Sequence, residues 1–425
     1  MDDERSAMRR DAEAAFRAGL AAVDPRAAVA RSFAGPGVVD LAAGRLELAS
    51  FARVRVAAVG KAATGMAEAW RAHAGAPSEG LVVAPRADPV EGFRALAGEH
   101  PVPGPGSLEA GEALLALAAA ADAEDLFVLL LSGGASALAE APRVPLSDLR
   151  ATTRLLLASG APIDVVNTVR RRLSRLKGGG LAEAAGRGTV ATLAISDVVG
   201  DDPAAIGSGP TVPDPSPPGA ARAALEARGL LAKLPASVAR VLADEPPPPR
   251  AAPRGGFRLV ASNATAVDAA RAALAARGWR VAPALALAGE ARDAGRAFAA
   301  RALAERGPVA LVAGGETTVS LGLDAGVGGR NQETALAMVE GLAGRRVVAL
   351  VAGTDGVDGP THAAGAFADG TSLERARAAG LDVPAALARH ASTHVFATLD
   401  DLFVTGPTGT NVADLAIALS REDGP

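Results

Sequence analysis

Cysteine is absent from the 425 residues of this sequence. Its absence excludes disulfide frameworks, thiolate zinc sites and cysteine nucleophiles together. No apolar stretch approaches the about 20 residues that a membrane-spanning helix needs, so we expect no contact with a membrane. The sequence starts with MDDERSAMRRDAEAAFRAGL, which is acidic and lacks the apolar core of a signal peptide. We therefore expect a cytoplasmic protein.

The chain also lacks an excess of basic residues and two common phosphate-binding motifs. Lys and Arg number 43 against 47 Asp and Glu, a net charge of −4, whereas a general nucleic-acid binder needs surplus positive charge to displace counterions. Lys61 follows a glycine but precedes Ala62, so no Gly-x4-Gly-Lys-Ser/Thr loop is present. No Gly-x-Gly-x-x-Gly opens a helix after a predicted strand. We therefore expect no nucleic-acid partner, and we exclude a P-loop NTPase and an ordinary Rossmann dehydrogenase.

Apolar residues, in contrast, make up 49% of the chain, which is enough for a large core. Short apolar runs alternate with Ala-, Arg- and Glu-rich segments of helical spacing. The runs predict strands at 54–59, 81–84, 126–131, 190–195, 257–261, 279–283, 309–313, 347–351 and 402–404. Most are apolar at every position, as in strands covered on both faces of a largely parallel sheet. The alternation of strands and helices predicts an α/β fold.

A proline-rich segment, ADEPPPPRAAPRGG at 243–256, divides the chain. Its prolines cannot lie inside a helix or a central strand, and they favour an extended polyproline conformation. We therefore predict two α/β domains with largely parallel sheets. A Rossmann-like N-terminal domain would occupy 1–245, a linker 246–256, and a smaller C-terminal domain 257–425.

Small residues follow most of the predicted strands. The turns are GK at 60–61, SGGAS at 132–136, SD at 196–197, GGETT at 314–318, GTDG at 353–356 and TGPTGTN at 405–411. Ligands of open α/β sheets bind at the carboxyl ends of strands, and glycine lets backbone N–H groups approach an anion. Turn geometry alone would explain each of them. Their shared position at one edge predicts an anion-binding site.

Two of these turns carry a charged residue suited to phosphoryl transfer. The Lys61 ammonium, at a strand-to-helix turn, could neutralise phosphate oxygens; the alternative is a solvated lysine at a helix start. Asp197 follows a buried strand, where a carboxylate suits Mg²⁺ binding or abstraction of a hydroxyl proton. Nearby, Asp201 and Asp202 are equally explained as caps of the next turn.

In the second half, Arg330 follows a glycine pair at a predicted helix start. Its guanidinium suits bidentate capture of a carboxylate or phosphate; the alternative is a surface ion pair with Glu333 or Glu316. The segment GTDGVDGPT holds Asp355 and Asp358 and is similar in composition to a cation-binding loop. Asp-Gly pairs also simply form turns.

A basic helix and five histidines complete the candidates. Asn167, Arg170 and Lys177 belong to a basic segment that runs into three glycines, which a glycine C-cap with a cationic last turn would explain. The histidines lack zinc spacing, and no Gly-x-Ser-x-Gly elbow accompanies them. We expect each of them to be structural or exposed: His73, His100, His362, His390 and His394.

Taken in order, the motifs resemble one family, the bacterial and archaeal glycerate 2-kinases with a C-terminal MOFRL-type domain. The matching segments include AVGKAATGMA, GEHPVPGPGSLEAG, LLSGGASALAEAP, IDVVNTVRRRLSRLKGGGLA, LAISDVVGDDPAAIGSGPTVPD, GGETTVSLGLDAGVGGRNQETALA, VAGTDGVDGPTHAAGA and VTGPTGTNVADLAIAL. The resemblance runs from about residue 54 to 419. It implies ATP-dependent phosphorylation of D-glycerate on its 2-hydroxyl, in a cleft between two α/β domains, by a monomer or homodimer.

In the family, functional importance attaches to the residues matched here by Lys61, Asp197 and Arg330. These are the catalytic candidates, and Asp197 and Asp355 are candidate ligands for Mg²⁺. The sequence leaves open whether Asp197 is a base or a metal ligand. We expect substrate and ATP contacts from Gly60, Ser132, Gly133, Gly134, Ser136, Asn167, Arg170, Lys177, Gly315, Glu316, Thr317, Asn331, Asp355, Asp358, Thr408 and Asn411.

Three positions depart from the family pattern. Ala135 replaces a usual glycine, Arg172 a usual histidine, and Gly104 a usual acidic residue. The methyl group of Ala135 stands in a loop expected to wrap an anion. Two other functions fit parts of the sequence: an NAD(P)H-dependent hydroxypyruvate reductase, against which the missing dinucleotide motif counts, and a non-catalytic sensor of nucleotides or sugar acids.

Overall fold

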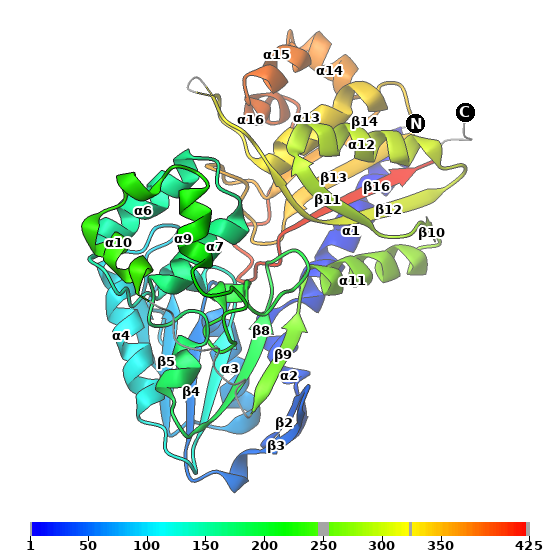
Figure 1. Ribbon diagram of the computed structural model, residues 1–425. Helices are drawn as coiled ribbons and strands as arrows, with labels where there is room; N and C mark the ends of the chain where they lie inside the picture. The colour runs from blue at the N-terminus through cyan, green and yellow to red at the C-terminus, as the bar shows by residue number, and fades with distance from the viewer. Residues whose placement is uncertain (1, 245–254, 323–324, 422–425) are drawn as a thin grey trace. The chain divides into compact units, whose positions relative to one another are not determined.

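The computed structural model describes residues 2–244, 255–322 and 325–421. Its chain forms two compact units (Figure 1). We call Pro25–Val260 the N-terminal unit, and Met1–Asp24 with Ala261–Pro425 the C-terminal unit. Among the described helices, none is long and apolar enough to cross a membrane.

The N-terminal unit is built on a six-stranded sheet of order β6-β5-β4-β7-β8-β9. The strands are β4 (Val54–Val59), β5 (Glu79–Ala84), β6 (Arg94–Ala97), β7 (Leu126–Leu131), β8 (Thr189–Ile195) and β9 (Gly256–Ala261). From β6 to β8 every pairing is parallel. The prediction of a largely parallel sheet is confirmed here, and the ends of β4 and β7 lie in register, with Val59 opposite Leu131.

Helices cover both faces of this sheet, which explains strands that are buried at nearly every position. On one face α4 (Pro105–Ala119), α5 (Ala135–Leu138) and α8 (Gly180–Ala184) share a core cluster with β4 and β7. Against the other face lie α2 (Pro25–Ala30) and α3 (Ala63–Ala74). A small antiparallel sheet of β1 (Phe33–Gly35), β2 (Val38–Leu41) and β3 (Gly44–Glu47), which the apolar runs do not predict, also belongs to this unit.

Four further helices form a layer with a core of its own. They are α6 (Leu146–Ala158), α7 (Ile163–Arg172), α9 (Ala220–Glu226) and α10 (Ala236–Ala243), and Figure 1 shows them gathered together. Leu149, Val169, Leu225 and Val238 are buried between them. Short 3-10 turns η1 (Leu48–Ser50), η2 (Ile206–Ser208) and η3 (Leu231–Lys233) connect elements of the unit.

The C-terminal unit contains a mixed sheet of order β10-β12-β16-β13-β14-β15, with β11 also paired to β12. Its strands are β10 (Arg280–Val281), β11 (Leu285–Glu290), β12 (Val309–Thr318), β13 (Val347–Gly353), β14 (Gly365–Asp369), β15 (Leu402–Phe403) and β16 (Asp414–Ser420). Only β10 and β11 run parallel to β12, and the other pairings are antiparallel. The prediction of a largely parallel sheet is therefore wrong for this half. Strands of this unit such as β13 and β16 are apolar at most positions because both faces of the sheet are covered, whichever direction the strands run.

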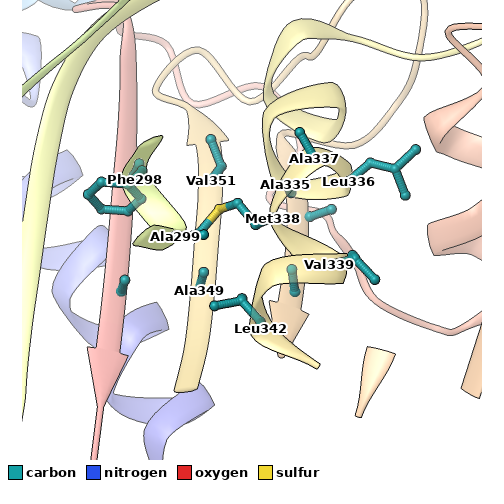
Figure 2. Close-up of a cluster of buried hydrophobic side chains, with 14 of the residues drawn as sticks. Phe298, Ala299, Ala335, Leu336, Ala337, Met338, Val339, Leu342, Ala349 and Val351 are labelled. Atoms are coloured by element: carbon teal, nitrogen blue, oxygen red, sulfur yellow. The ribbon is translucent and has the colours of Figure 1, made fainter. Parts of the chain in front are cut away.

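One face of this sheet packs on α12 (Ala291–Ala304) and α13 (Arg330–Leu342). Figure 2 shows Met338 of α13 between that helix and Ala349 and Val351 of β13, with Phe298 of α12 nearby. Helices α1 (Asp2–Ala22) and α11 (Asn263–Ala276) contact the sheet as well. The short helices α14 (Ser372–Ala378), α15 (Val383–Ala388) and α16 (Ser392–Thr398) complete the unit.

The observed division of the chain differs from the predicted one at its start. Helix α1 packs in the C-terminal unit, where Arg9 forms ion pairs with Asp369 at 2.5 Å and with Asp401 at 2.7 Å. The indole Nε1 of Trp279 donates to Asp11 at 2.9 Å. These partners of α1 are more than 250 residues away in sequence. The residues around position 24 therefore carry no local pattern that marks the boundary between α1 and the N-terminal unit. Most of the predicted linker, 246–254, lies outside the described residues.

Candidate active site

Two loops at the carboxyl ends of β4 and β7 pack against each other through their backbones. The N–H of Lys61 donates to Gly133 O at 2.9 Å, and the N–H of Ala62 donates to Ser132 Oγ at 3.1 Å. Gly60 has φ of +128°, and a Cβ atom there would lie 2.1 Å from Ser132 Oγ. Glycine is therefore required at position 60, and the close approach fixes Lys61 beside the Ser132 loop.

Three side chains border the glycine pair of that loop. A Cβ at Gly133 would lie 2.2 Å from Asp197 Oδ2, and one at Gly134 would lie 3.2 Å from His100 Cδ2 and 3.4 Å from Lys61 Cγ. The predicted residues Lys61, Gly133, Gly134 and Asp197 are thus brought together from the three segments that follow β4, β7 and β8. His100, which we expected to be structural or exposed, is exposed and borders the same glycine pair. The signal that could have found it is its place in GEHPVPGPGS, directly before α4.

Two residues that depart from the family pattern, Ala135 and Arg172, have packing or polar partners of their own. Ala135 begins α5 and is buried in the core cluster beneath the sheet, so its methyl group is used in packing. Arg172 forms an ion pair with Asp214 at 3.5 Å and donates to Ser216 O at 3.2 Å. The guanidinium of Arg172 therefore anchors a surface loop.

Ser136 and Arg170 are linked directly. Nη2 of Arg170, on α7, donates to Ser136 O at 2.9 Å, and the Ser136 hydroxyl lies 2.9 Å from that of Ser208. Burial lowers the pKa of the Arg170 guanidinium. Asn167 lies one turn earlier on the same helix.

Lys177 is placed differently from the prediction that it contacts a ligand. Its ammonium forms a buried ion pair with Glu140, whose Oε1 accepts from Ser174 Oγ at 2.6 Å. Burial lowers the pKa of Lys177 to about 8, with Arg170 adding to this effect and Glu140 opposing it. The nearby glycines do not end a helix as expected: α7 ends at Arg172, and Gly179 is the N-cap of α8. Lys177 is therefore a core residue.

In the C-terminal unit, Arg330 is the first residue of α13 and binds two carboxylates. Its Nε and Nη2 contact Asp414 at 2.5 and 2.9 Å, and Nη1 contacts Glu316 at 3.0 Å. Burial alone would lower the pKa of Arg330, but the hydrogen bonds and charge of Asp414, together with Glu316, hold it above its usual value. The expected alternative pair with Glu316 is present, whereas Glu333 binds Arg292 and His390 instead.

The N-terminus of α13 holds a carboxylate of the protein itself. Asp358 accepts the backbone N–H groups of Asn331 at 3.0 Å and Gln332 at 2.8 Å. Burial raises the pKa of Asp358 to about 6, with Asp414 adding to this effect, while those N–H bonds and Arg330 oppose it. An anion site at this helix end is therefore filled by Asp358, which is structural and not placed to contact a ligand there.

Asn331, Asp355 and Asp414 surround Gly353 at the end of β13. A Cβ at Gly353 would lie 3.3 Å from Asn331 Nδ2, 3.3 Å from Asp414 Oδ1 and 3.4 Å from Asp355 Oδ1. Asn331 Nδ2 donates to Asp414 Oδ1 at 3.0 Å, and its buried Oδ1 has no hydrogen-bond partner among the described residues. The cluster therefore offers an amide oxygen and carboxylates within one small volume.

The remaining predicted residues of this unit are in or near the same strands. The GGETT segment is not a turn but the end of β12, where Gly315 has φ of +141° and a Cβ would lie 2.2 Å from Leu287 O. Thr317 is buried, and its hydroxyl lies 3.4 Å from that of Thr334. Thr408 donates to Thr354 O at 2.6 Å, and Asn411 Oδ1 accepts from Ala413 N at 3.3 Å. Thr408 therefore lies against the loop that holds Asp355.

Within the residues that the structure describes, neither unit contains a dedicated metal cage. In the described parts of the chain, no group of three His, Cys, Asp or Glu side chains could hold a metal ion. Mg²⁺ commonly needs only one or two carboxylates when substrate phosphates supply further oxygens. Asp197, whose carboxylate lies against the bare backbone of Gly133, fits that requirement.

Comparison with known proteins covers almost the whole chain. The family described as "Domain of unknown function (DUF4147)" matches residues 11–243, and the MOFRL family matches residues 309–414. A protein of Agrobacterium vitis named "Putative hydroxypyruvate reductase" is 40% identical over 95% of this chain and 92% of its own. A glycerate 2-kinase of Pyrococcus horikoshii is 40% identical over 75% of this chain and 76% of its own. The crystal structure of a glycerate kinase from Thermotoga maritima has a TM-score of 0.85 at 34% identity, over 98% of this chain and 100% of the other.

Proposed function

The chain belongs to the glycerate 2-kinase family, and from this membership we propose that it transfers the γ-phosphoryl group of ATP to the 2-hydroxyl of D-glycerate. The single observation that best supports this is the cluster of Lys61, Asp197 and the Gly133–Gly134 backbone at the carboxyl ends of parallel strands. It combines a cation, a carboxylate and close backbone approach, the groups that phosphoryl transfer requires.

In this reaction the 2-hydroxyl oxygen of glycerate forms a bond to the γ-phosphorus of ATP, while the bond from that phosphorus to the ADP oxygen breaks. If Asp197 acts as the base, its carboxylate, which lies beside Gly133, accepts the hydroxyl proton. Lys61 neutralises negative charge on the transferring group. Its position is fixed because its own N–H is bound to Gly133 O. The products are 2-phosphoglycerate and ADP.

Mg²⁺, when bound with ATP, would neutralise and orient the phosphate oxygens. Asp197 is our first candidate ligand in the N-terminal unit, and Asp355 our candidate in the C-terminal unit. The roles of base and metal ligand at Asp197 are alternatives that the proposal keeps. A dependence of ADP release on the divalent cation, altered in Asp197→Asn, tests the second role.

The C-terminal unit contributes a rigid guanidinium. Arg330 is held by Asp414, which is fully buried, and by Glu316, while its own side chain stays 34% exposed. A guanidinium oriented in this way stabilises anionic oxygens with little reorganisation. We propose that Arg330 binds phosphate oxygens, and that Asn331 and Thr408 keep its surroundings ordered.

The name of the Agrobacterium vitis relative raises a second candidate, reduction of hydroxypyruvate by NAD(P)H. The loop after β4 reads GKAATG and contains no dinucleotide-binding glycine pattern. A reductase would oxidise NADH with hydroxypyruvate when ATP is omitted. A non-catalytic sensor would bind ATP and release no ADP.

One experiment separates these functions. The purified chain is assayed for coupled ADP release over a panel of small hydroxy acids, and NMR determines the phosphate position in the product. We expect D-glycerate to be the best acceptor and C2 to carry the phosphate. ADP release that does not depend on any hydroxy acid, or NADH oxidation in its place, would refute the kinase.

A further inference from the structure

The N-terminal unit contains a cavity of about 80 Å³ that no step of the proposed reaction uses. Its walls come from the segment that follows His100 and from helices α6 and α7. The lining residues are Pro101, Val102, Pro103, Glu140, Leu149, Arg150, Thr153, Arg154, Leu157 and Arg170. A water molecule needs about 10–15 Å³ measured in this way. The cavity therefore has room for an acid of about three carbons.

Positive charge dominates the polar part of this wall. Arg150, Arg154 and Arg170 face a single carboxylate, Glu140, which is already bound to Lys177. The guanidinium of Arg150 donates to Pro103 O at 2.8 and 2.5 Å, and that of Arg170 to Ser136 O at 2.9 Å. These acceptors are neutral carbonyls, and no ion pair to the three arginines is formed within the described chain. The wall of the cavity thus carries more positive than negative charge.

Apolar side chains surround these charges. Val102 and Leu157, at 47% and 62% exposure, are among the most exposed large apolar residues described, and both line the cavity. Leu149 is buried in its wall. Apolar walls lower the local dielectric constant, which strengthens a guanidinium–carboxylate pair formed inside.

Two direct links connect the cavity to the cluster of Lys61 and Asp197. His100, which lies beside the backbone of Gly134, is bonded to Pro101 of the cavity wall. Arg170, also in the wall, holds Ser136 in the segment that follows Gly134. The cavity wall is therefore joined to the loop that carries the proposed transfer chemistry, through the backbone at His100 and through the hydrogen bond of Arg170 to Ser136.

We propose that this cavity is the acceptor subsite, in which Arg154 and Arg170 bind the carboxylate of a small 2-hydroxy acid. Arg150 positions the Pro103 backbone and adds to the positive potential. This inference rests on the proposed kinase function and deepens it, because it names the residues that require an acidic acceptor. In this assignment Arg330 binds phosphate oxygens and not the carboxylate of the acceptor.

The first test is calorimetric binding of D-glycerate to the full-length chain, which requires no turnover. We expect Arg154→Gln to weaken binding at least tenfold. Arg170→Lys provides a second variant that keeps the charge but loses the guanidinium fork, and we expect it to weaken binding as well. Arg240→Gln, an exposed arginine on α10 outside the cavity, is the matched control and should bind as the wild type does.

The second test is kinetic. Arg154→Gln should raise the KM for D-glycerate at least tenfold while kcat and the KM for ATP change less than twofold. Glycerol, which has no carboxylate, should be phosphorylated equally slowly by wild type and variant. An unchanged KM for D-glycerate in both cavity variants would overturn the inference while leaving the kinase intact. A wild type that binds D-glycerate through Arg154 but releases no ADP would refute the kinase and keep the binding site.

Discussion

Oδ2 of Asp197 lies 2.2 Å from the position that a Cβ atom would take at Gly133. No side chain fits there without displacing the carboxylate, so we expect Gly133→Ala to move Asp197 and lower kcat by about tenfold to a hundredfold, since small misplacements of reacting groups are costly. Steady-state kinetics together with circular dichroism measure this. Gly35→Ala, in β1 with open space around it and no positive φ, is the control. Normal kcat in Gly133→Ala would remove Asp197 from the reaction.

Removal of either proposed cation should cost activity without loss of the fold. We expect Lys61→Ala and Arg330→Ala each to reduce kcat by about a hundredfold or more, the usual effect of deleting a preorganised charge donor. Lys233→Ala, an exposed lysine of η3, is the matched control for Lys61. A loss below about threefold in both variants would contradict the roles that we assign to these residues.

The buried pair of Glu140 and Lys177 should show strong coupling in stability. Lys177→Met alone leaves a carboxylate buried without its partner and should lower the free energy of unfolding by about 3–5 kcal/mol. The double variant Glu140→Gln/Lys177→Met, which keeps the acceptor for Ser174, should recover most of that loss. Urea denaturation of the two single variants and the double variant measures the coupling. If the losses in the free energy of unfolding of the two single variants simply add up in the double variant, the ion pair between Glu140 and Lys177 does not stabilise the fold as a pair.

Asp358 should make stability depend on pH. Because its folded pKa is about 6, above its usual 3.8, the folded chain holds this proton more tightly than the unfolded chain does. The stabilising contribution is therefore complete below pH 4 and is lost as pH rises through 6, by up to about 3 kcal/mol. The comparison is between wild type and Asp358→Asn in urea from pH 4 to 7. If the difference in the free energy of unfolding between wild type and Asp358→Asn stays constant from pH 4 to 7, Asp358 does not take up a proton more tightly in the folded chain.

The strands were the most predictable part of the fold. Seven of the nine predicted runs lie within strands, because an apolar run such as LFVLLL at 126–131 can be covered on both faces only inside a layered fold. At 279–283 and 402–404 only Arg280–Val281 and Leu402–Phe403 are strand residues. Direction could not be predicted, since burial is the same in β7, which is parallel to its neighbours, and in β16, which is antiparallel to both of its own. The short strand β14, which contains a glycine, carries too weak a pattern to predict.

For the candidate site, position after a strand was the useful signal. It identified Lys61 and Asp197, which the loop geometry brings to one place. It could not identify partners that come from distant segments, such as Asp414 for Arg330 or Glu140 for Lys177, because no local pattern marks them. His100 was not identified for the same reason. It lies beside Gly134, which belongs to the loop after β7 and is distant from His100 in sequence.

Helix α1 is translated before two of its partners: Asp369 follows Arg9 by 360 residues, and Asp401 lies further along the chain. At about 5–20 residues per second, this delay lasts roughly 20–70 seconds. During that interval Pro25–Val260 can acquire its own core while the helix waits with its binding face uncovered. Until Asp369 and Asp401 are present, α1 lacks the carboxylates that pair with Arg9, so its packing depends on the completion of the C-terminal unit.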